Sequence, residues 1–189
     1  GVTPLQYAAR NGHSALVQNL LEVAKGDPNS DAGTATDAPL LLAAERGYEL
    51  IVRHLLSSGA NTKQVKKDET NRTHLFLAAE NGHEAIINYP LTPLEIDAKD
   101  DDGYTALMYA AGRGSEDFVR VLLENRADVK ITRTNGRTAL HQAAYFGQSK
   151  TAQLLLKKDP SVLSCRDHNN LSALHLAITG SEAAFATML

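Results

Sequence analysis

Residues 102–114 read DGYTALMYAAGRG, and residues 135–147 read NGRTALHQAAYFG. The two stretches start 33 residues apart, and each is followed by a leucine pair, Leu122-Leu123 in the first case and Leu155-Leu156 in the second. Self-similarity at a fixed period of this size is typical of proteins built as stacks of like units. We therefore expect repetition to organise the whole chain.

The repeated unit reads as two helices joined by a tight turn. The hydroxyl of Thr105 can accept a backbone N–H that the first helical turn leaves free, and Gly114 and Gly147 stand where a left-handed helix end needs glycine. Apolar residues at 3,4 spacing over 118–123 predict a second, amphipathic helix. Two helices this short cannot bury their apolar faces alone, so the units must stack. The predicted fold is all-α.

Six units share one register. The first leucine of each short helix recurs at spacings of 35, 35, 32, 33 and 34 residues, at Leu5, Leu40, Leu75, Leu107, Leu140 and Leu174. We predict a single repeat domain over residues 1–189. Its repeats are expected at residues 1–32, 33–67, 68–99 (irregular), 100–132, 133–166 and 167–189 (partial).

These motifs carry a family resemblance. Residues 1–13, GVTPLQYAARNGH, and residues 138–141, TALH, resemble the signature of the ankyrin repeat family. The resemblance covers essentially the whole chain. It implies L-shaped repeats in which antiparallel helix pairs alternate with β-hairpin-like fingers. It also implies a solenoid whose concave face is made of fingers and first helices.

Two repeats depart from the pattern. Ala38 stands where the capping threonine belongs, so the first helix of the second repeat should be less well capped. In the third repeat Pro90 replaces the first leucine of the pair, and an interior proline costs a helix about 3 kcal/mol. We predict that the second helix of this repeat ends near Asn88 or Tyr89 and that an extended stretch follows to Ile96.

Composition excludes several classes of partner. The net charge is −3, so no global basic field favours nucleic acid or an anionic membrane. No apolar run approaches the roughly 20 residues that span a bilayer. With Cys165 as its single cysteine the chain can form no internal disulfide, which suggests an intracellular, cytoplasmic or nuclear, location. We expect a monomer, and because residue 1 already stands at the repeat glycine the chain looks like a fragment.

No catalytic motif is found in the sequence. Phosphate loops, nucleophile elbows and His-Glu-x-x-His helices are all missing. His141 and His175 recur at one register position, and the resemblance implies that such histidines hydrogen-bond the loops of the repeats. We therefore predict no enzyme activity, no cofactor and no metal.

The resemblance implies that recognition uses residues beside the repeat glycine and at the end of each first helix. Carried over by position, the candidate partner-binding residues are Arg72, Asp101, Asp102, Tyr104, Arg113, Arg137, Tyr145 and Phe146. Tyrosine, phenylalanine and arginine are enriched at interface centres. We expect one aromatic and basic patch on repeats 4 and 5, formed by Tyr104, Arg113, Arg137, Tyr145 and Phe146.

Two alternatives stay open at these positions. Phe146 can instead fold back against the neighbouring repeat. Asp101 and Asp102 can form either an acidic rim for a basic partner or an ordinary solvated turn.

The resemblance thus implies a non-catalytic protein-interaction module, a scaffold or adaptor that binds a partner protein or peptide through its concave face. The alternative is a regulatory or targeting ankyrin segment of a larger enzyme, channel or ubiquitin-ligase adaptor.

Overall fold

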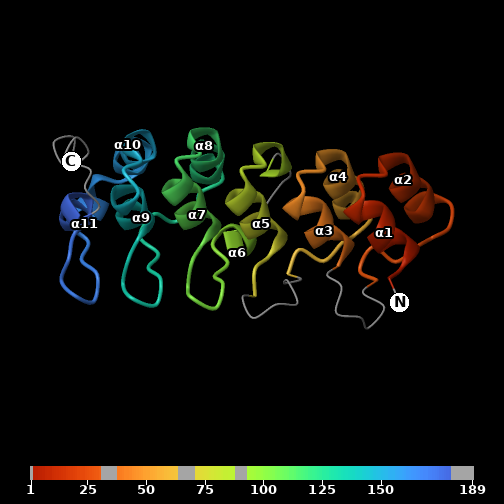
Figure 1. Ribbon diagram of the computed structural model, residues 1–189, viewed down its shortest axis with the longest axis horizontal. Coiled ribbons are helices and arrows are strands. Elements are labelled where there is room, and N and C mark those ends of the chain that lie inside the picture. Colours follow the sequence, from red (N-terminus) through yellow and green to blue (C-terminus); the bar gives the residue numbers. More distant parts are fainter. Residues whose placement is uncertain (1, 31–37, 64–70, 88–92, 180–189) are drawn as a thin grey trace. The chain divides into compact units, whose positions relative to one another are not determined.

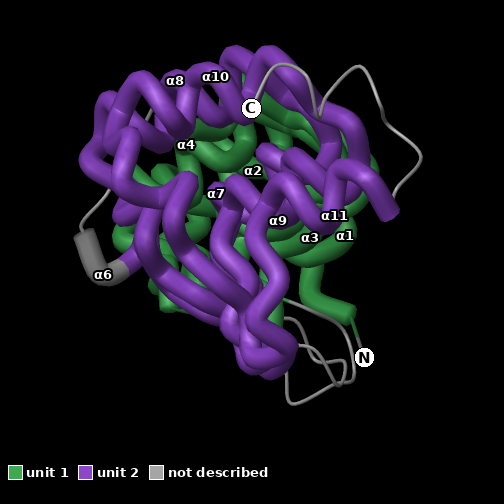
Figure 2. The backbone as a smooth tube through the Cα atoms, turned by 90° about the vertical axis from the view of Figure 1, so that its left-hand side faces the viewer, with its two compact units in different colours: residues 1–90 green, residues 91–189 purple. Residues whose placement is uncertain are grey.

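The structure is a computed structural model that describes residues 2–30, 38–63, 71–87 and 93–179. Its contacts divide the chain into two compact units, residues 1–90 and residues 91–189 (Figure 2). The boundary between the units falls inside the predicted third repeat, next to Pro90. The six repeat limits predicted from the sequence stay predictions.

Unit 1 consists of helix pairs. The first helices α1, α3 and α5 pack side by side in that order, and α2 packs against α4 (Figure 1). The elements of unit 1 are α1 (Pro4–Arg10), α2 (Ser14–Glu22), α3 (Pro39–Glu45), α4 (Glu49–Ser57), α5 (His74–Asn81) and the 3-10 turn η1 (Glu84–Ile87).

Unit 2 repeats the arrangement. The first helices α7, α9 and α11 form one row, α8 packs against α10, and the connecting loops project from the side of the first helices (Figure 1). The elements of unit 2 are α6 (Pro93–Ile96), α7 (Ala106–Arg113), α8 (Glu116–Glu124), α9 (Ala139–Tyr145), α10 (Ser149–Lys158), the 3-10 turn η2 (Pro160–Ser164) and α11 (Ala173–Thr179).

The first helices begin where the sequence predicts. In α1 the hydroxyl of Thr3 accepts the N–H of Gln6 at 3.1 Å, while the Thr3 N–H donates to the Gln6 side chain at 2.8 Å. The two bonds together form a capping box. Thr105 accepts the N–H of Met108 at 3.4 Å. Ala38 provides no side-chain cap to α3, as its apolar side chain predicts.

Glycine is required at the turn between the two helices of a repeat. Gly114 has φ +77°, and a Cβ added to it would lie 2.2 Å from Oε1 of Gln148, in the following repeat. Gly147 also has a positive φ, of 68°. The turn therefore needs glycine for its backbone angle, whereas the Gln148 side chain beside Gly114 is flexible and could move.

The loops of unit 2 are β-hairpin-like fingers, as the resemblance implies. Each closes with the same hydrogen bond between backbone atoms four residues apart: Asp100 N to Tyr104 O (3.0 Å), Arg133 N to Arg137 O (2.9 Å) and Asp167 N to Leu171 O (2.8 Å). Neighbouring fingers are linked as well, because Thr134 N donates to Asp102 O at 3.2 Å and His168 N donates to Asn135 O at 2.9 Å.

The core lies along the first helices. Leu5, Leu40, Leu75, Leu107 and Leu140 are each 4% exposed or less, so the register read from the sequence is the register of the core. Leu174, the sixth of the series, is 39% exposed. Within the described residues, α11 packs against the first helix of one neighbouring repeat, α9. Leu174 is therefore covered by a first helix on one side only.

His141 has the structural role that the resemblance implies. Its Nδ1 lies 3.2 Å from the N–H of Thr138, and its Nε2 lies 3.2 Å from the carbonyl of Leu171 in the next finger. Burial lowers the pKa of His141, and the Leu171 carbonyl opposes this only in part. His175 repeats the local bond, with Nδ1 at 2.7 Å from the hydroxyl of Ser172.

One prediction about the third repeat is wrong. Residues 93–96 were expected to be extended, but they form the short helix α6. Proline is tolerated in the first turn of a helix, where its missing N–H would be unpaired in any case. The predicted helix end near Asn88 or Tyr89 lies outside the described residues. Before it, residues 84–87 form a 3-10 turn.

Candidate functional site

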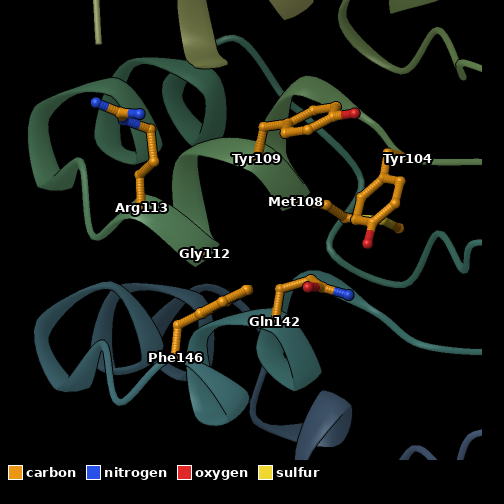
Figure 3. Close-up of a pocket in the computed structure, with 7 residues that line it drawn as sticks. All are labelled: Tyr104, Met108, Tyr109, Gly112, Arg113, Gln142 and Phe146. Carbon is orange, nitrogen blue, oxygen red and sulfur yellow. The ribbon is translucent and has the colours of Figure 1, made fainter. Parts of the chain in front are cut away.

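A pocket of about 300 Å³ opens between α7 and α9 of unit 2 (Figure 3). Residues of α7 form one wall, Gln142 of α9 and Phe146 just after that helix form the other, and Tyr104 comes from the finger that precedes α7. The lining residues are Tyr104, Met108, Tyr109, Gly112, Arg113, Gln142 and Phe146. The pocket is therefore aromatic on several sides, with one cation and one amide.

The tyrosine wall is held in place by bonds outside the pocket. The rings of Tyr104 and Tyr109 stack with centroids 5.0 Å apart, and the guanidinium of Arg133 lies 4.0 Å from the Tyr104 centroid. The Tyr109 hydroxyl donates to Asp100 at 2.9 Å. Burial raises the pKa of Asp100, although the N–H of Tyr104 and the Tyr109 hydroxyl both favour its ionised form. Asp100 therefore has the structural role of a buried anchor.

Phe146 is both exposed and packed. Its side chain is 54% exposed and meets Tyr145 edge to face at 5.0 Å. A Cβ added to Gly112 would lie 3.2 Å from Cδ2 of Phe146, so the ring lies directly over the backbone of α7. Both interpretations of Phe146 therefore apply, because the ring packs against the neighbouring repeat and also lines the pocket.

Gly112 makes room for the pocket. It stands five residues after the first leucine of its helix, where the other repeats carry Arg10, Glu45, Glu80, Tyr145 and Thr179. Gly112 is the one position of this register without a side chain. Because any of those side chains would occupy the space beside Phe146, the missing side chain keeps the seam between α7 and α9 open.

Gln142 is the polar exception at another register position. Two residues after the first leucine, the other repeats carry Tyr7, Leu42, Leu77, Tyr109 and Leu176. Gln142 is only 5% exposed and lines the pocket. Its side-chain amide has no hydrogen-bond partner within the described ranges. The amide therefore faces the open pocket without a partner among the described residues and can bond with water or a ligand there.

Arg113 places a positive charge at the rim. It is exposed at the end of α7. No carboxylate of the described residues lies within ion-pair distance of it. The charge of Arg113 is therefore available to a ligand that enters beside Phe146.

The structure places the other predicted residues elsewhere. Arg137 was expected in the same patch, but its Nε pairs with Asp167 at 3.1 Å, and it does not line the pocket. Burial would raise the pKa of Asp167, but the N–H of Leu171 and the guanidinium of Arg137 outweigh it, so the pKa is lowered. Tyr145 is 46% exposed and touches the pocket only through Phe146.

Three candidates lie away from this pocket. Arg72 belongs to unit 1, where its guanidinium pairs with the carboxylate of Glu80. Asp101 and Asp102 are exposed at the turn of the finger that carries Tyr104. The backbone carbonyl of Asp102 accepts the N–H of Thr134 in the next finger. Whether these three residues bind a partner stays a prediction.

Sequence reasoning missed part of the lining. Met108, Tyr109 and Gln142 were not among the candidates, because candidates were taken from finger and helix-end positions only. A signal for Gln142 was present in the sequence, since it is a polar residue at a register position that is apolar or aromatic in the five other repeats. Met108 and Tyr109 gave no such signal.

Neither a metal site nor a membrane span is found in the described ranges. No group of three or more His, Cys, Asp or Glu side chains in residues 2–30, 38–63, 71–87 and 93–179 could hold a metal ion. In the same ranges no helix has the length and apolar character to cross a bilayer. What the α7–α9 pocket offers is surface for contact: aromatic rings, an amide and a cation.

Both units are assembled from one recurring helix pair, so the chain is a helical repeat protein. The family model for ankyrin repeats in three copies matches residues 1–66, 40–133 and 126–189. The chain therefore belongs to the ankyrin repeat family, as the signature residues suggested. Ankyrin repeats are a non-catalytic fold that mediates protein–protein interaction.

The chain is similar to parts of much longer proteins. It is 44% identical to inversin of Danio rerio over 64 residues, 33% of this chain and 6% of inversin. It is 44% identical to BTB/POZ domain-containing protein 1 of Schizosaccharomyces pombe over 75 residues, 39% of this chain and 6% of that protein. It is 38% identical to the human transient receptor potential cation channel subfamily A member 1 over 90 residues, 46% of this chain and 8% of the channel.

Proposed function

We propose that this chain is a scaffold or adaptor module that binds a partner protein through the face of fingers and first helices, with its main contact at the α7–α9 pocket. One observation carries the proposal: Phe146 is 54% exposed beside an open, mostly aromatic pocket. Exposed aromatic rings next to a pocket mark interaction sites more often than ordinary surface. The partner is expected inside the cell, and the module needs no second copy to bind it.

A binding selection tests this proposal. The whole chain is offered a phage-displayed library of random dodecapeptides, and an enriched peptide is then measured by fluorescence polarisation. We expect Gly112→Leu, which fills the pocket, and Phe146→Ser, which removes one wall, each to weaken binding by more than about tenfold, the loss expected at a hot spot. Tyr7→Ala is the control, because Tyr7 is a similarly exposed aromatic residue (58%) in unit 1.

The outcomes separate clearly. Thermal unfolding of each variant shows whether its fold is intact. Peptides that bind wild type and Gly112→Leu equally would place binding elsewhere and contradict the proposed site. A library without any enriched peptide would contradict peptide binding altogether.

The sizes of the relatives favour a second candidate function. The matched stretches are 6–8% of a cation channel, a BTB/POZ-domain protein and inversin. In that candidate the repeats position or restrain other domains of a longer protein. Sequencing the full transcript tests it, because a reading frame limited to these repeats would remove the idea.

A further inference from the structure

The geometry points to an extended peptide segment as the occupant of the α7–α9 pocket: its main-chain amide pairs with Gln142, an aliphatic side chain fills the cavity, and an acidic residue a few positions away reaches Arg113. This inference rests on the proposed function and names the chemistry of the partner. Its three parts follow from three separate observations on the pocket.

The first part comes from the unpaired amide of Gln142. A glutamine side chain offers one carbonyl acceptor and one NH₂ donor, which is the complement of a peptide group. Gln142 is only 5% exposed. Its amide lines the pocket without a partner in the described part of the chain. Most ligand side chains could satisfy only one of these groups, apart from those of asparagine and glutamine, whereas the main chain of an extended segment can satisfy both whatever its sequence.

The second part comes from the walls. The two tyrosines, Met108 and Phe146 present apolar surface around about 300 Å³ of space. Gly112 keeps that space free, as the Cβ contact with Phe146 shows. A side chain of the size of leucine, isoleucine or methionine buries its apolar surface there, and that burial favours binding.

The third part comes from charge. Aromatic walls can also attract a cation, such as a methylated lysine. Here the guanidinium of Arg133 already lies against Tyr104, and Arg113 adds a second positive charge at the rim. Because like charges repel, a cationic occupant is disfavoured, while a carboxylate gains an attraction to Arg113.

The helix geometry limits where the acidic residue stands. Met108 and Arg113 are five residues apart on α7, which corresponds to about 7.5 Å along a helix axis. An extended chain covers that length in roughly two residues. We therefore expect an aliphatic anchor with aspartate or glutamate two or three residues away, on one side only.

The experiment uses the whole chain and a synthetic dodecapeptide taken from the library selection. Replacing the aliphatic anchor by alanine should weaken binding by about tenfold or more, as burial of a full side chain implies. Replacing the acidic residue by its amide should weaken binding to wild type about threefold to tenfold but leave binding to Arg113→Glu unchanged, because the ion pair is then already lost.

The bond to Gln142 needs a double-mutant cycle. N-methylation of a peptide bond next to the anchor removes one backbone donor, and it should weaken binding to wild type by about tenfold, the value of one buried hydrogen bond. The same N-methylation should cost far less in Gln142→Leu, where the partner amide is gone. Equal losses in both proteins would overturn the assignment of Gln142.

Two further outcomes would contradict the inferred peptide chemistry but leave the proposed binding function intact. A peptide that loses affinity with Gly112→Leu but prefers trimethyl-lysine over leucine at the anchor would make the pocket a cation site. A pocket-bound peptide that keeps full affinity for Arg113→Glu would remove the acidic residue. By contrast, a peptide that ignores Gly112→Leu would contradict both proposals, since it would bind elsewhere.

Discussion

Two contacts between first helices, α3 with α5 and α7 with α9, have the same backbone arrangement but differ in their side chains. In unit 1, α3 packs against α5, and the register position two residues after the first leucine holds Leu42 and Leu77, 4% and 1% exposed. In unit 2, α7 packs against α9, and the same position holds Tyr109 and Gln142. The first seam is a sealed core, whereas the second lines a pocket.

The position at the helix ends shows the same contrast. Five residues after the first leucine, the sealed seam carries Glu45 and Glu80, while the open seam carries Gly112 and Tyr145. The helices themselves differ little in length. The two seams therefore differ in side-chain identity at two register positions, and the seam with glycine and glutamine at these positions is the one that lines the pocket.

The largest effect is expected from moving the polar residue into the sealed seam. Leu77 packs with Ala38 and Leu41, all nearly fully buried. Leu77→Gln should lower the free energy of unfolding by about 3 kcal/mol, because a buried amide without partners adds to the lost packing. Urea denaturation measures it, and Leu50→Gln at a 55% exposed position should change little. A loss below about 1 kcal/mol would mean that the seam is not sealed.

The reciprocal change should have the opposite sign. Gln142→Leu gives α9 the residue found at this register in α3, α5 and α11. We expect the free energy of unfolding to rise by about 1 kcal/mol, since apolar surface at a position only 5% exposed replaces an amide without a partner among the described residues. Destabilisation in the same urea titration would show that Gln142 is already satisfied, and the contrast between the two seams would then lose its basis.

Much of the repeat architecture can be predicted from the sequence, because the spacing of the repeat positions along the chain is enough to locate them. Five of the six leucines that define the repeats lie in the core, and the threonine and glycine positions begin and end the helices where local chemistry requires. Ala38 was predicted to leave its helix less well capped for the same reason, and it provides no side-chain cap. Local rules such as these need no knowledge of neighbouring repeats.

The details that sequence reasoning missed depend on neighbours. Arg137 looks like an exposed finger residue, but Asp167 in the next finger, 30 residues later, takes its guanidinium. The miss at residues 93–96 is local instead: Pro93 was taken to end helical structure, but proline also suits the first turn of a helix. The pocket depends on the missing side chain of Gly112, which faces the ring of Phe146 just after α9, and neither repeat shows this relation alone.

A smaller effect is expected on the pH dependence of the unfolding free energy. Burial lowers the folded-state pKa of His141 below its ordinary value, so the unfolded chain binds more protons as the pH falls below about 6.5. His141 therefore contributes stability above that pH and loses it as the pH falls toward the folded-state pKa. His141→Gln should keep the cap, since Gln6 forms the same bonds with Thr3. The difference in unfolding free energy between variant and wild type should shift in favour of the variant between pH 7.5 and pH 5. A constant difference, or the reverse slope, would contradict a buried neutral histidine.

The smallest change in stability is expected for Gly112→Ala, which should affect stability and peptide binding in opposite directions. Glycine inside a helix costs roughly 0.5–1 kcal/mol relative to alanine. In Gly112→Ala the new methyl group meets Phe146 at 3.2 Å, and that exposed ring can move by a few tenths of an ångström. We expect a net gain of about 0.5 kcal/mol in unfolding free energy, together with weaker binding of the selected peptide. Gly112→Ala in a chain that also carries Phe146→Ser is the control, because the gain should grow once the ring is gone. If Gly112→Ala instead lowers stability, the ring is fixed, and the open seam is as rigidly packed as the sealed one.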